Sequence, residues 1–279
     1  MKHPLKTLGA LILGMALLVG CESLHVKQGE WIFNPRAGSW GGTADAVKDM
    51  HDVWIEFEST ETKQPVKLHA LWHPAAKPDA PVLMYLHGAR WNVTGSAYRI
   101  QRMRDLGFNV LAVDYRGFGK SSPQTPSESM AYEDARAAWQ WLATAHADKP
   151  RFIFGHSLGG AVAIELATQV TDEQGTIVEG TFTSIAEVFR TMRWGWLPLG
   201  GFITQRFDAV AKVARIGSPL LVVHGSDDSL IKPELGRQLF DAAVEPKRFV
   251  LVEGGSHHNT NAVGHAAYRT ALRDLFGLL

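Results

Sequence analysis

Phe152-Ile153-Phe154-Gly155-His156-Ser157-Leu158-Gly159-Gly160-Ala161-Val162-Ala163 is the stretch of this chain that decides its fold. An apolar run typical of a buried strand ends at Gly155, and a run typical of a helix begins at Leu158. Between them lies Gly-x-Ser-x-Gly, the pattern of a strand-to-helix turn so tight that its serine is strained and exposed. An ordinary glycine-rich turn is the alternative, but the flanking strand and helix favour a catalytic Ser157.

Strand-like and helix-like segments alternate around this turn. Alternating apolar and polar residues over 53–58 and 66–72 predict two edge antiparallel strands. Apolar runs predict the other, parallel strands at 81–86, 108–113, 151–154, 177–182, 219–223 and 248–252. Helices are predicted at 98–106, 132–145, 235–243 and 262–276. This order indicates one α/β domain over residues 51–279, with a mostly parallel sheet of about eight strands and helices on both faces.

Composition and charge narrow the class of protein. The chain has 279 residues, of which 46% are hydrophobic and 20% charged, with 28 Lys and Arg against 28 Asp and Glu. Two of the lysines fall within residues 1–20, which leaves 26 basic and 28 acidic residues in the remainder. This balance gives no electrostatic basis for binding nucleic acid or an anionic membrane surface.

The first twenty residues have the pattern of a signal peptide. Two lysines precede an apolar run over 8–19 that is too short to span a bilayer as a helix. Leu18-Val19-Gly20-Cys21 follows and resembles the lipobox of bacterial lipoproteins, and Cys21 is the only cysteine. The resemblance implies cleavage before Cys21, lipid attachment to its sulfur and a place in the bacterial cell envelope. Glu22 mildly favours the outer membrane if the source has two membranes. An ordinary signal peptide or a short uncleaved anchor is the alternative.

Two further segments have weaker signals. Residues 21–50 are predicted to be a tether and lead-in, because glycines and a proline interrupt any periodicity while a few aromatic residues suit docking on the domain. Residues 183–214 lie at the usual position of a cap and are predicted to form two small helices, Ile185 to Trp196 and Ile203 to Ala214. Apolar residues between those helices either pack on the core or form a lip over Ser157 that accepts an acyl or aryl group. The residues concerned are Gly29, Pro35, Gly38, Gly41, Gly42, Trp31, Phe33 and Trp40 in the first segment, and Trp194, Trp196, Leu197 and Leu199 in the second.

Acidic and histidine residues follow later strands in the order that a catalytic serine requires. An exposed serine is a weak nucleophile until a base takes its proton. The predicted strand at 219–223 runs into His-Gly-Ser-Asp-Asp over 224–228, and the strand at 248–252 runs into Glu-Gly-Gly-Ser-His-His over 253–258. His-Gly-Ala over 87–89 follows another strand, so the N–H of Ala89 is expected to pair with that of Leu158 as an oxyanion hole.

Together these features resemble the α/β-hydrolase superfamily, and most closely its Bem46-like and ABHD13/ABHD17-like serine hydrolases. Asp-Tyr-Arg-Gly-Phe-Gly-Lys-Ser over 114–121 and Arg-Phe-Asp over 206–208 carry the closer resemblance. It implies that Asp228 is the acid and His257 the base of a Ser-His-Asp triad with Ser157. The adjacent Asp227 and His258 remain alternatives for these two roles.

The expected activity is hydrolysis of a carboxylic ester or thioester through an acyl-enzyme intermediate. Amidase or peptidase chemistry with the same triad stays open, and so does a non-catalytic binding lipoprotein on a hydrolase scaffold. We expect a small acyl compound as substrate and the membrane, through Cys21, as the other partner. No cofactor and no metal are expected, because His69 and His73 are four apart on a strand, where that spacing makes no helical metal pair.

Overall fold

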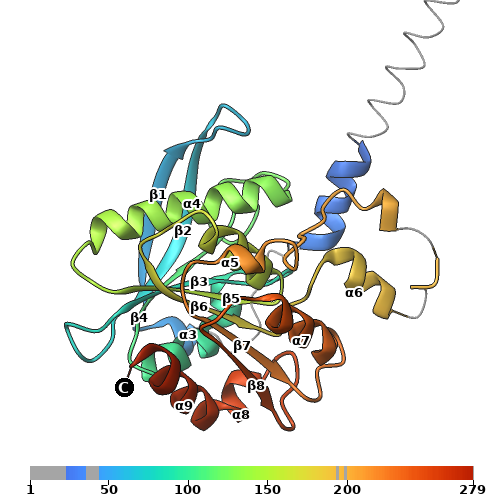
Figure 1. Cartoon of the computed structure of the whole chain (residues 1–279). Coiled ribbons are helices and arrows are strands. Elements are labelled where there is room, and N and C mark those ends of the chain that lie inside the picture. Colours follow the sequence, from blue (N-terminus) through green and yellow to red (C-terminus); the bar gives the residue numbers. More distant parts are fainter. Residues whose placement is uncertain (1–22, 36–43, 193–194, 198–199, 279) are drawn as a thin grey trace, which may run out of the picture.

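An eight-stranded sheet forms the centre of the protein in a computed structural model, which describes residues 23–35, 44–192, 195–197 and 200–278 (Figure 1). The strand order is β1-β2-β4-β3-β5-β6-β7-β8. The strands are β1 (His51–Glu58), β2 (Pro65–His73), β3 (Val82–Leu86), β4 (Asn109–Val113), β5 (Arg151–His156), β6 (Glu173–Glu179), β7 (Leu220–Gly225) and β8 (Lys247–Val252).

Strand direction follows the prediction. β1 is antiparallel to β2, and β2 is antiparallel to β4, while all pairs from β4 to β8 are parallel. Residues of β3 and β4 are buried throughout, as expected for strands covered on both faces. The parallel strands therefore present their carboxyl ends, and the loops that follow them, along one edge of the sheet.

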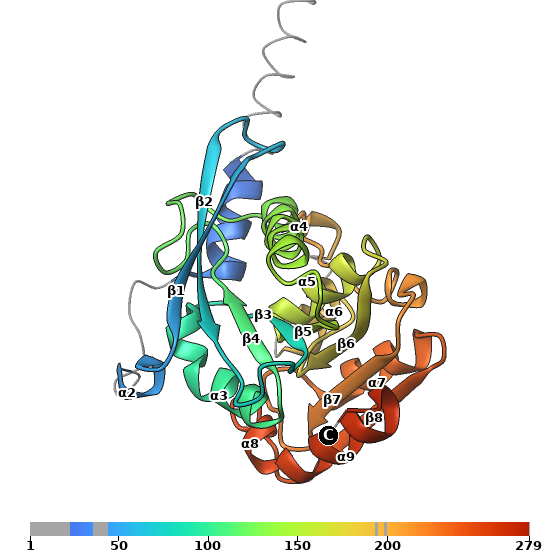
Figure 2. The ribbon, with the colours of Figure 1, turned by 90° about the vertical axis from the view of Figure 1, so that its left-hand side faces the viewer.

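Helices cover both faces of this sheet (Figures 1 and 2). One face packs against α4 (Glu128–Ala145), α5 (Leu158–Ala167) and α7 (Pro233–Ala242), and the other against α3 (Ala97–Asp105) and α9 (His265–Phe276). The shorter elements are α2 (Ala44–Val47), α6 (Ile185–Thr191), α8 (Thr260–Val263) and the 3₁₀ turns η1 (Val93–Ser96), η2 (Gly200–Phe202) and η3 (Val213–Arg215). The two faces bury separate hydrophobic cores, so the predicted α/β class is confirmed.

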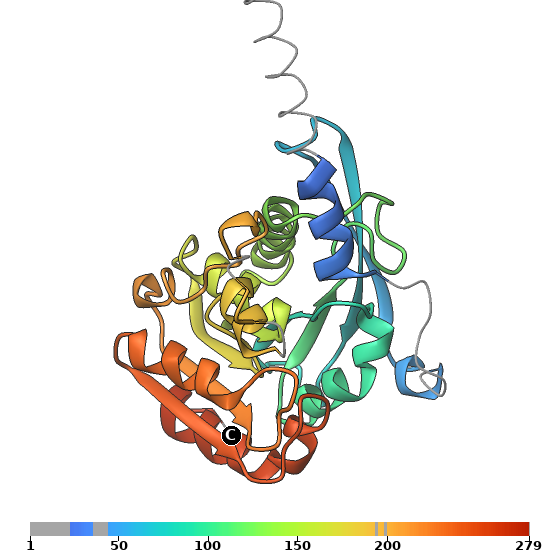
Figure 3. The ribbon, with the colours of Figure 1, turned by 90° about the vertical axis from the view of Figure 1, so that its right-hand side faces the viewer.

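The segment expected to be a tether contains a helix over residues 23–33, here called the N-terminal helix, which lies beside α4 (Figures 2 and 3). The expectation that Gly29 interrupts periodic structure is wrong, because this residue is helical. Its missing Cβ lets the helix approach the carbonyl of Pro126. The side chain of Phe33 is fully buried, with ring centroids 6.1 Å from Phe118 and 5.6 Å from Phe207.

The cap differs from its prediction in one half. The first predicted helix is present as α6 but ends at Thr191, and its N-cap Ser184 accepts a hydrogen bond from the Glu187 N–H at 3.2 Å. The helix predicted from Ile203 to Ala214 is wrong: the chain there is irregular until the short 3₁₀ turn η3. Trp196 and Leu197 are described, and Trp196 is 74% exposed rather than packed on the core. Trp194 and Leu199 lie outside the described residues.

The predicted signal peptide and Cys21 also fall outside the described residues, so they stay predictions. Within the part of the chain that the structure describes, no helix has the length and apolarity needed to cross a bilayer.

Candidate active site

Ser157 occupies the tight turn between β5 and α5. Its backbone has φ 55° and ψ −122°, a conformation that costs a non-glycine residue roughly 1–3 kcal/mol and persists only when neighbours enforce it. The Ser157 N–H donates to the carbonyl of Glu179 at 2.9 Å. A Cβ on Gly155 would collide with the backbone of Gly159, and one on Gly159 with the carbonyl of Leu86. Both glycines are therefore required by close backbone approach.

Asp228 and His257 meet at the same edge of the sheet. His257 Nδ1 lies 2.8 Å from Asp228 Oδ2, and both residues are buried. A Cβ on Gly180, just after β6, would lie 3.4 Å from each of these two atoms. Asp228 Oδ1 accepts the N–H groups of Leu230 at 3.0 Å and Ile231 at 2.8 Å. These contacts fix the carboxylate so that it orients the imidazole.

The two alternative residues point elsewhere. Asp227 is exposed, and its carboxylate accepts the hydroxyl of Ser226 at 3.0 Å. His258 is exposed as well, and its carbonyl accepts the Arg99 guanidinium at 3.2 Å. The geometry thus brings Asp228 together with His257, while the catalytic roles themselves stay predictions.

Electrostatics keep Asp228 ionised. Burial by itself raises the pKa of this carboxyl, but hydrogen bonds from His224 and His257 outweigh burial and hold the pKa well below its usual range. His224 Nε2 lies 3.4 Å from Asp228 Oδ2 and 2.9 Å from the carbonyl of Ile231. An ionised carboxylate is what the orienting member of a triad requires, because it stabilises the imidazolium that forms during catalysis.

The predicted oxyanion loop runs directly beside the turn at Ser157. A Cβ on Gly88 would lie 3.0 Å from the Ser157 Cβ, which places Ala89 next to the serine. Among the described residues, the N–H groups of Ala89 and Leu158 have no hydrogen-bond acceptor. Arg90 has φ 76°, a strained value for a side chain of this size, and its N–H donates to the carbonyl of Phe33 at 2.7 Å. The end of the N-terminal helix therefore holds this loop.

Asp114 supports the same loop from the other side. Its Oδ1 accepts the N–H of Val93 at 2.8 Å, and its Oδ2 lies 3.0 Å from His69 Nδ1. His87, at the start of the loop, has Nε2 3.5 Å from Asp114 Oδ1, and burial lowers its pKa. The histidines at 69 and 87 thus belong to the support of the loop, and His69 faces two carboxylates rather than a metal site.

Two supporting residues were not among the predicted site residues. His156 Nε2 donates to the carbonyl of His257 at 3.0 Å, since a carbonyl can only accept. Burial holds the pKa of His156 well below its usual range, so its ring is neutral. Arg99, on α3, pairs with Glu179 at 2.9 Å as well as binding the carbonyl of His258. The position of His156 inside the serine motif was a signal for it, whereas nothing local to Arg99 in the sequence marks its role.

Comparisons with known proteins indicate the family of the chain. The model of the Hydrolase_4 family, described as serine aminopeptidase S33, matches residues 76–207, which include Ser157. An uncharacterized protein of Mycobacterium tuberculosis is 31% identical over 250 residues, covering 88% of this chain and 86% of its own length. Lysophosphatidylserine lipase ABHD12 of Danio rerio is 33% identical over 210 residues, covering 63% of this chain and 54% of its own.

A solved structure shares the architecture. The Pyrococcus furiosus esterase Pf2001 superimposes with a TM-score of 0.67 at 22% identity, covering 87% of this chain and 97% of that one. At this level of identity the likeness supports the fold alone.

Proposed function

The chain belongs to the α/β-hydrolase superfamily, and from that premise we propose that it is a serine hydrolase of carboxylic esters or thioesters. The observation that carries the proposal is the 2.8 Å contact between His257 Nδ1 and Asp228 Oδ2, beside a serine held at φ 55°. A strained, half-buried serine and an oriented imidazole are the two parts that nucleophilic catalysis needs.

In the proposed reaction the Ser157 hydroxyl attacks the acyl carbon while His257 Nε2 takes its proton. The N–H groups of Ala89 and Leu158 stabilise the tetrahedral oxyanion. Collapse of this intermediate breaks the bond to the leaving group, which receives the proton from His257 and departs, leaving an acyl-Ser157. A water molecule, deprotonated by His257, then attacks the acyl carbon, and serine and acid are released. Asp228 keeps the His257 Nδ1–H directed away from the serine throughout.

As substrate class we propose esters of membrane lipids that carry a single acyl chain. The Danio rerio relative is named a lysophosphatidylserine lipase, and this supports the choice. So does the lipobox-like sequence before Cys21, from which we propose that the protein is anchored by lipid in the bacterial envelope, with the outer membrane favoured in a two-membrane cell. The family description as a serine aminopeptidase favours a second candidate, cleavage of an amide with the same triad.

The test is labelling by a fluorophosphonate together with turnover of p-nitrophenyl esters of rising chain length and of an aminoacyl p-nitroanilide. Ser157→Ala should lose both labelling and turnover by roughly 10³-fold or more, and His257→Ala should lose labelling. His258→Ala is the matched control and should keep most of both. Turnover retained in Ser157→Ala would place the chemistry elsewhere, and faster cleavage of the anilide would select the amidase.

The anchor is tested separately by intact mass and by incorporation of labelled palmitate. The mature chain should begin at Cys21 and carry the label, and Cys21→Ser should carry none. An unmodified Cys21, or a mature protein that starts elsewhere, would contradict the anchor.

A further inference from the structure

Exposed large apolar side chains gather on two segments of this protein. Among the described residues twelve such side chains are exposed, and six of them belong to the N-terminal helix or the cap: Leu24, Val26, Trp31, Met192, Trp196 and Phe202. The other six are scattered over the described chain. Four lie on β1, α3, β8 and α8, and two lie in the loops before and after α7: Trp54, Tyr98, Leu251, Val263, Leu230 and Val244. Single exposed apolar residues need no explanation, but a gathered set marks a surface that contacts something.

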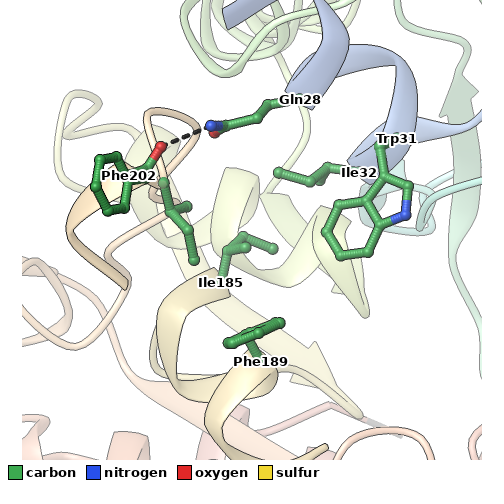
Figure 4. Close-up of a pocket in the computed structure, with 7 residues that line it drawn as sticks. Gln28, Trp31, Ile32, Ile185, Phe189 and Phe202 are labelled. Carbon is green, nitrogen blue, oxygen red and sulfur yellow. Dashed lines mark hydrogen bonds between the residues drawn. The ribbon is translucent and has the colours of Figure 1, made fainter. Parts of the chain in front are cut away.

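The two segments lie side by side (Figure 4). Gln28 donates to the carbonyl of Phe202 at 2.6 Å and accepts the Thr204 N–H at 2.7 Å. Leu24, Gln28 and Trp31 recur at helical spacing, so one face of the N-terminal helix is turned toward the cap. A cavity of about 210 Å³ lies between the helix and the cap, with Trp31 and Ile32 on one side and Ile185, Phe189, Phe202 and Ile203 on the other. We call Leu24, Trp31, Met192, Trp196 and Phe202 the apolar rim.

The N-terminal helix, which carries part of the apolar rim, follows Cys21 closely in sequence, and this indicates that a membrane covers the rim. The described helix begins two residues after Cys21, and Trp31 lies about 12 Å along the axis from its first described residue. A lipid on Cys21 therefore brings a bilayer to this end of the molecule. Tryptophan is the side chain best suited to the boundary between headgroups and acyl chains. Nearby exposed charges are mixed, with Lys27 and Arg190 against Glu30 and Glu187, so attraction depends on apolar insertion and not on anionic lipid.

We propose that the apolar rim docks into the leaflet that carries the Cys21 anchor, with Trp31 and Trp196 at the boundary between the headgroups and the acyl chains. The proposal rests on the anchor and on the substrate class given above. Docking would turn the cap toward the membrane that holds the proposed substrate.

The first test is quenching of tryptophan fluorescence in the full mature, lipidated chain reconstituted into phosphatidylcholine vesicles with brominated acyl chains. Replacing both rim tryptophans, Trp31→Phe with Trp196→Phe, should lower the quenched intensity roughly twofold, because these rings would contact the acyl chains. Trp54→Phe is the matched control: Trp54 is 40% exposed but lies on β1, outside the rim, so quenching should not change. Unchanged quenching in the double variant, or an equal fall in Trp54→Phe, would overturn the docking.

A second measurement separates docking from catalysis. Trp31→Asp should slow turnover of a long-chain monoacyl ester embedded in vesicles roughly fivefold, since a carboxylate resists insertion, and leave turnover of soluble p-nitrophenyl acetate unchanged. Trp54→Asp should change neither. An equal loss on both esters would overturn the docking. If the rim double variant lowers quenching and Trp54→Phe does not, the docking is supported even when the wild-type chain cleaves neither ester. That combination would contradict the proposed hydrolase function instead.

Discussion

The turn at Ser157 and the N-terminal helix both border the candidate active site, but different forces hold them in place. The turn is held by close backbone approach, since Gly155 and Gly159 leave no room for a Cβ beside the facing carbonyls. The helix is held by distant packing, with Phe33 buried against Phe118 and Phe207. Close backbone approach requires particular residues next to one another, so it is visible as a short sequence motif. Distant packing requires only aromatic residues that are far apart in the sequence, so it is visible as no motif.

The two regions meet at the oxyanion loop. The turn brings Ser157 against Gly88, and the helix ends with the carbonyl of Phe33 on the Arg90 N–H. Ala89 lies between these two contacts. Gly88 before it packs against the rigid turn, and Arg90 after it is held by the N-terminal helix, which can detach. Because a docked helix can open locally while the sheet stays folded, the comparison predicts a global effect for damage to the turn and a local one for damage to the helix.

The largest effect is expected for Gly159→Ala. The added Cβ would meet the carbonyl of Leu86, which belongs to a central strand and cannot move away. Overpacking costs roughly 1–3 kcal/mol where neighbours can adjust. Because the backbone of β3 cannot adjust, the cost at Gly159 should exceed this range, so we expect little folded protein and no esterase activity. The control is Gly217→Ala, whose added Cβ would have nothing within 4 Å. Denaturant unfolding of both variants is the measurement, and a Gly159→Ala protein of normal stability would show that the turn tolerates a side chain.

A smaller and local effect is expected for Phe33→Ala. Removing a buried phenylalanine costs about 3 kcal/mol at the low end of the usual range, and opening of the helix limits the loss to this segment. Hydrogen exchange should accelerate in the N-terminal helix and around Arg90 but not in the sheet, and kcat should fall because the oxyanion loop loses its support. Val26→Ala, on an exposed position of the same helix, should stay within about 0.5 kcal/mol of the wild type. Equal acceleration across the sheet would mean that the helix is part of one cooperative unit.

The difference between local backbone contacts and distant packing also explains which secondary-structure elements could be predicted from the sequence. All eight predicted strands are present, two from their apolar and polar alternation and six from their apolar runs, but the strand predicted at 177–182 begins and ends earlier, as β6. The motif around Ser157 predicted its own turn. Two errors in secondary structure, the missed N-terminal helix and the helix expected from Ile203 to Ala214, concern segments that contact each other. Gln205 lies in the irregular stretch, and its side chain bonds His25 at 3.0 Å and the Glu128 N–H at 2.6 Å. Such partners are far apart in sequence, so neither segment's conformation is encoded by its own periodicity.

The candidate site shows the same division. Spacing after strands nominated the two adjacent pairs, Asp227 with Asp228 and His257 with His258, and the family resemblance implied Asp228 and His257, which the structure places in contact. Local sequence was not enough to choose between adjacent carboxylates, because that choice depends on which side chain the loop turns inward. Nor did it identify Arg99, whose partners Glu179 and His258 come from other parts of the chain.

A moderate fall in kcat is expected for His156→Ala, in the rigid turn next to Ser157. The Nε2–H of His156 fixes the carbonyl of His257, so His156→Ala should lower kcat roughly tenfold, the value of about one hydrogen bond, with KM nearly unchanged. His156→Gln, which still carries an N–H donor, should restore most of the rate. The exposed His51→Ala serves as control. A loss of the same size in the alanine and glutamine variants would show that His156 matters for packing and not for positioning the base.

The smallest effect is expected from pH acting on His69, which supports the oxyanion loop through Asp114. Burial opposes protonation of His69, but hydrogen bonds to Asp114 and Asp52 outweigh it and raise the pKa above the usual 6.5. The folded state therefore holds this proton more tightly than the unfolded chain does. The stabilisation is fully present below about pH 6.5 and is lost as the pH rises through the raised value in the folded protein.

The measurement is the difference in unfolding free energy between the wild type and His69→Gln at several pH values. Glutamine keeps a hydrogen-bonding side chain but cannot titrate, so the wild type should gain stability over His69→Gln near pH 6, and this gain should shrink at alkaline pH. If the loop has two supports, alkaline pH should also lower kcat more in Phe33→Ala than in the wild type. A pH-independent difference between wild type and His69→Gln would mean that His69 is neutral in the folded protein, leaving the N-terminal helix as the support that matters.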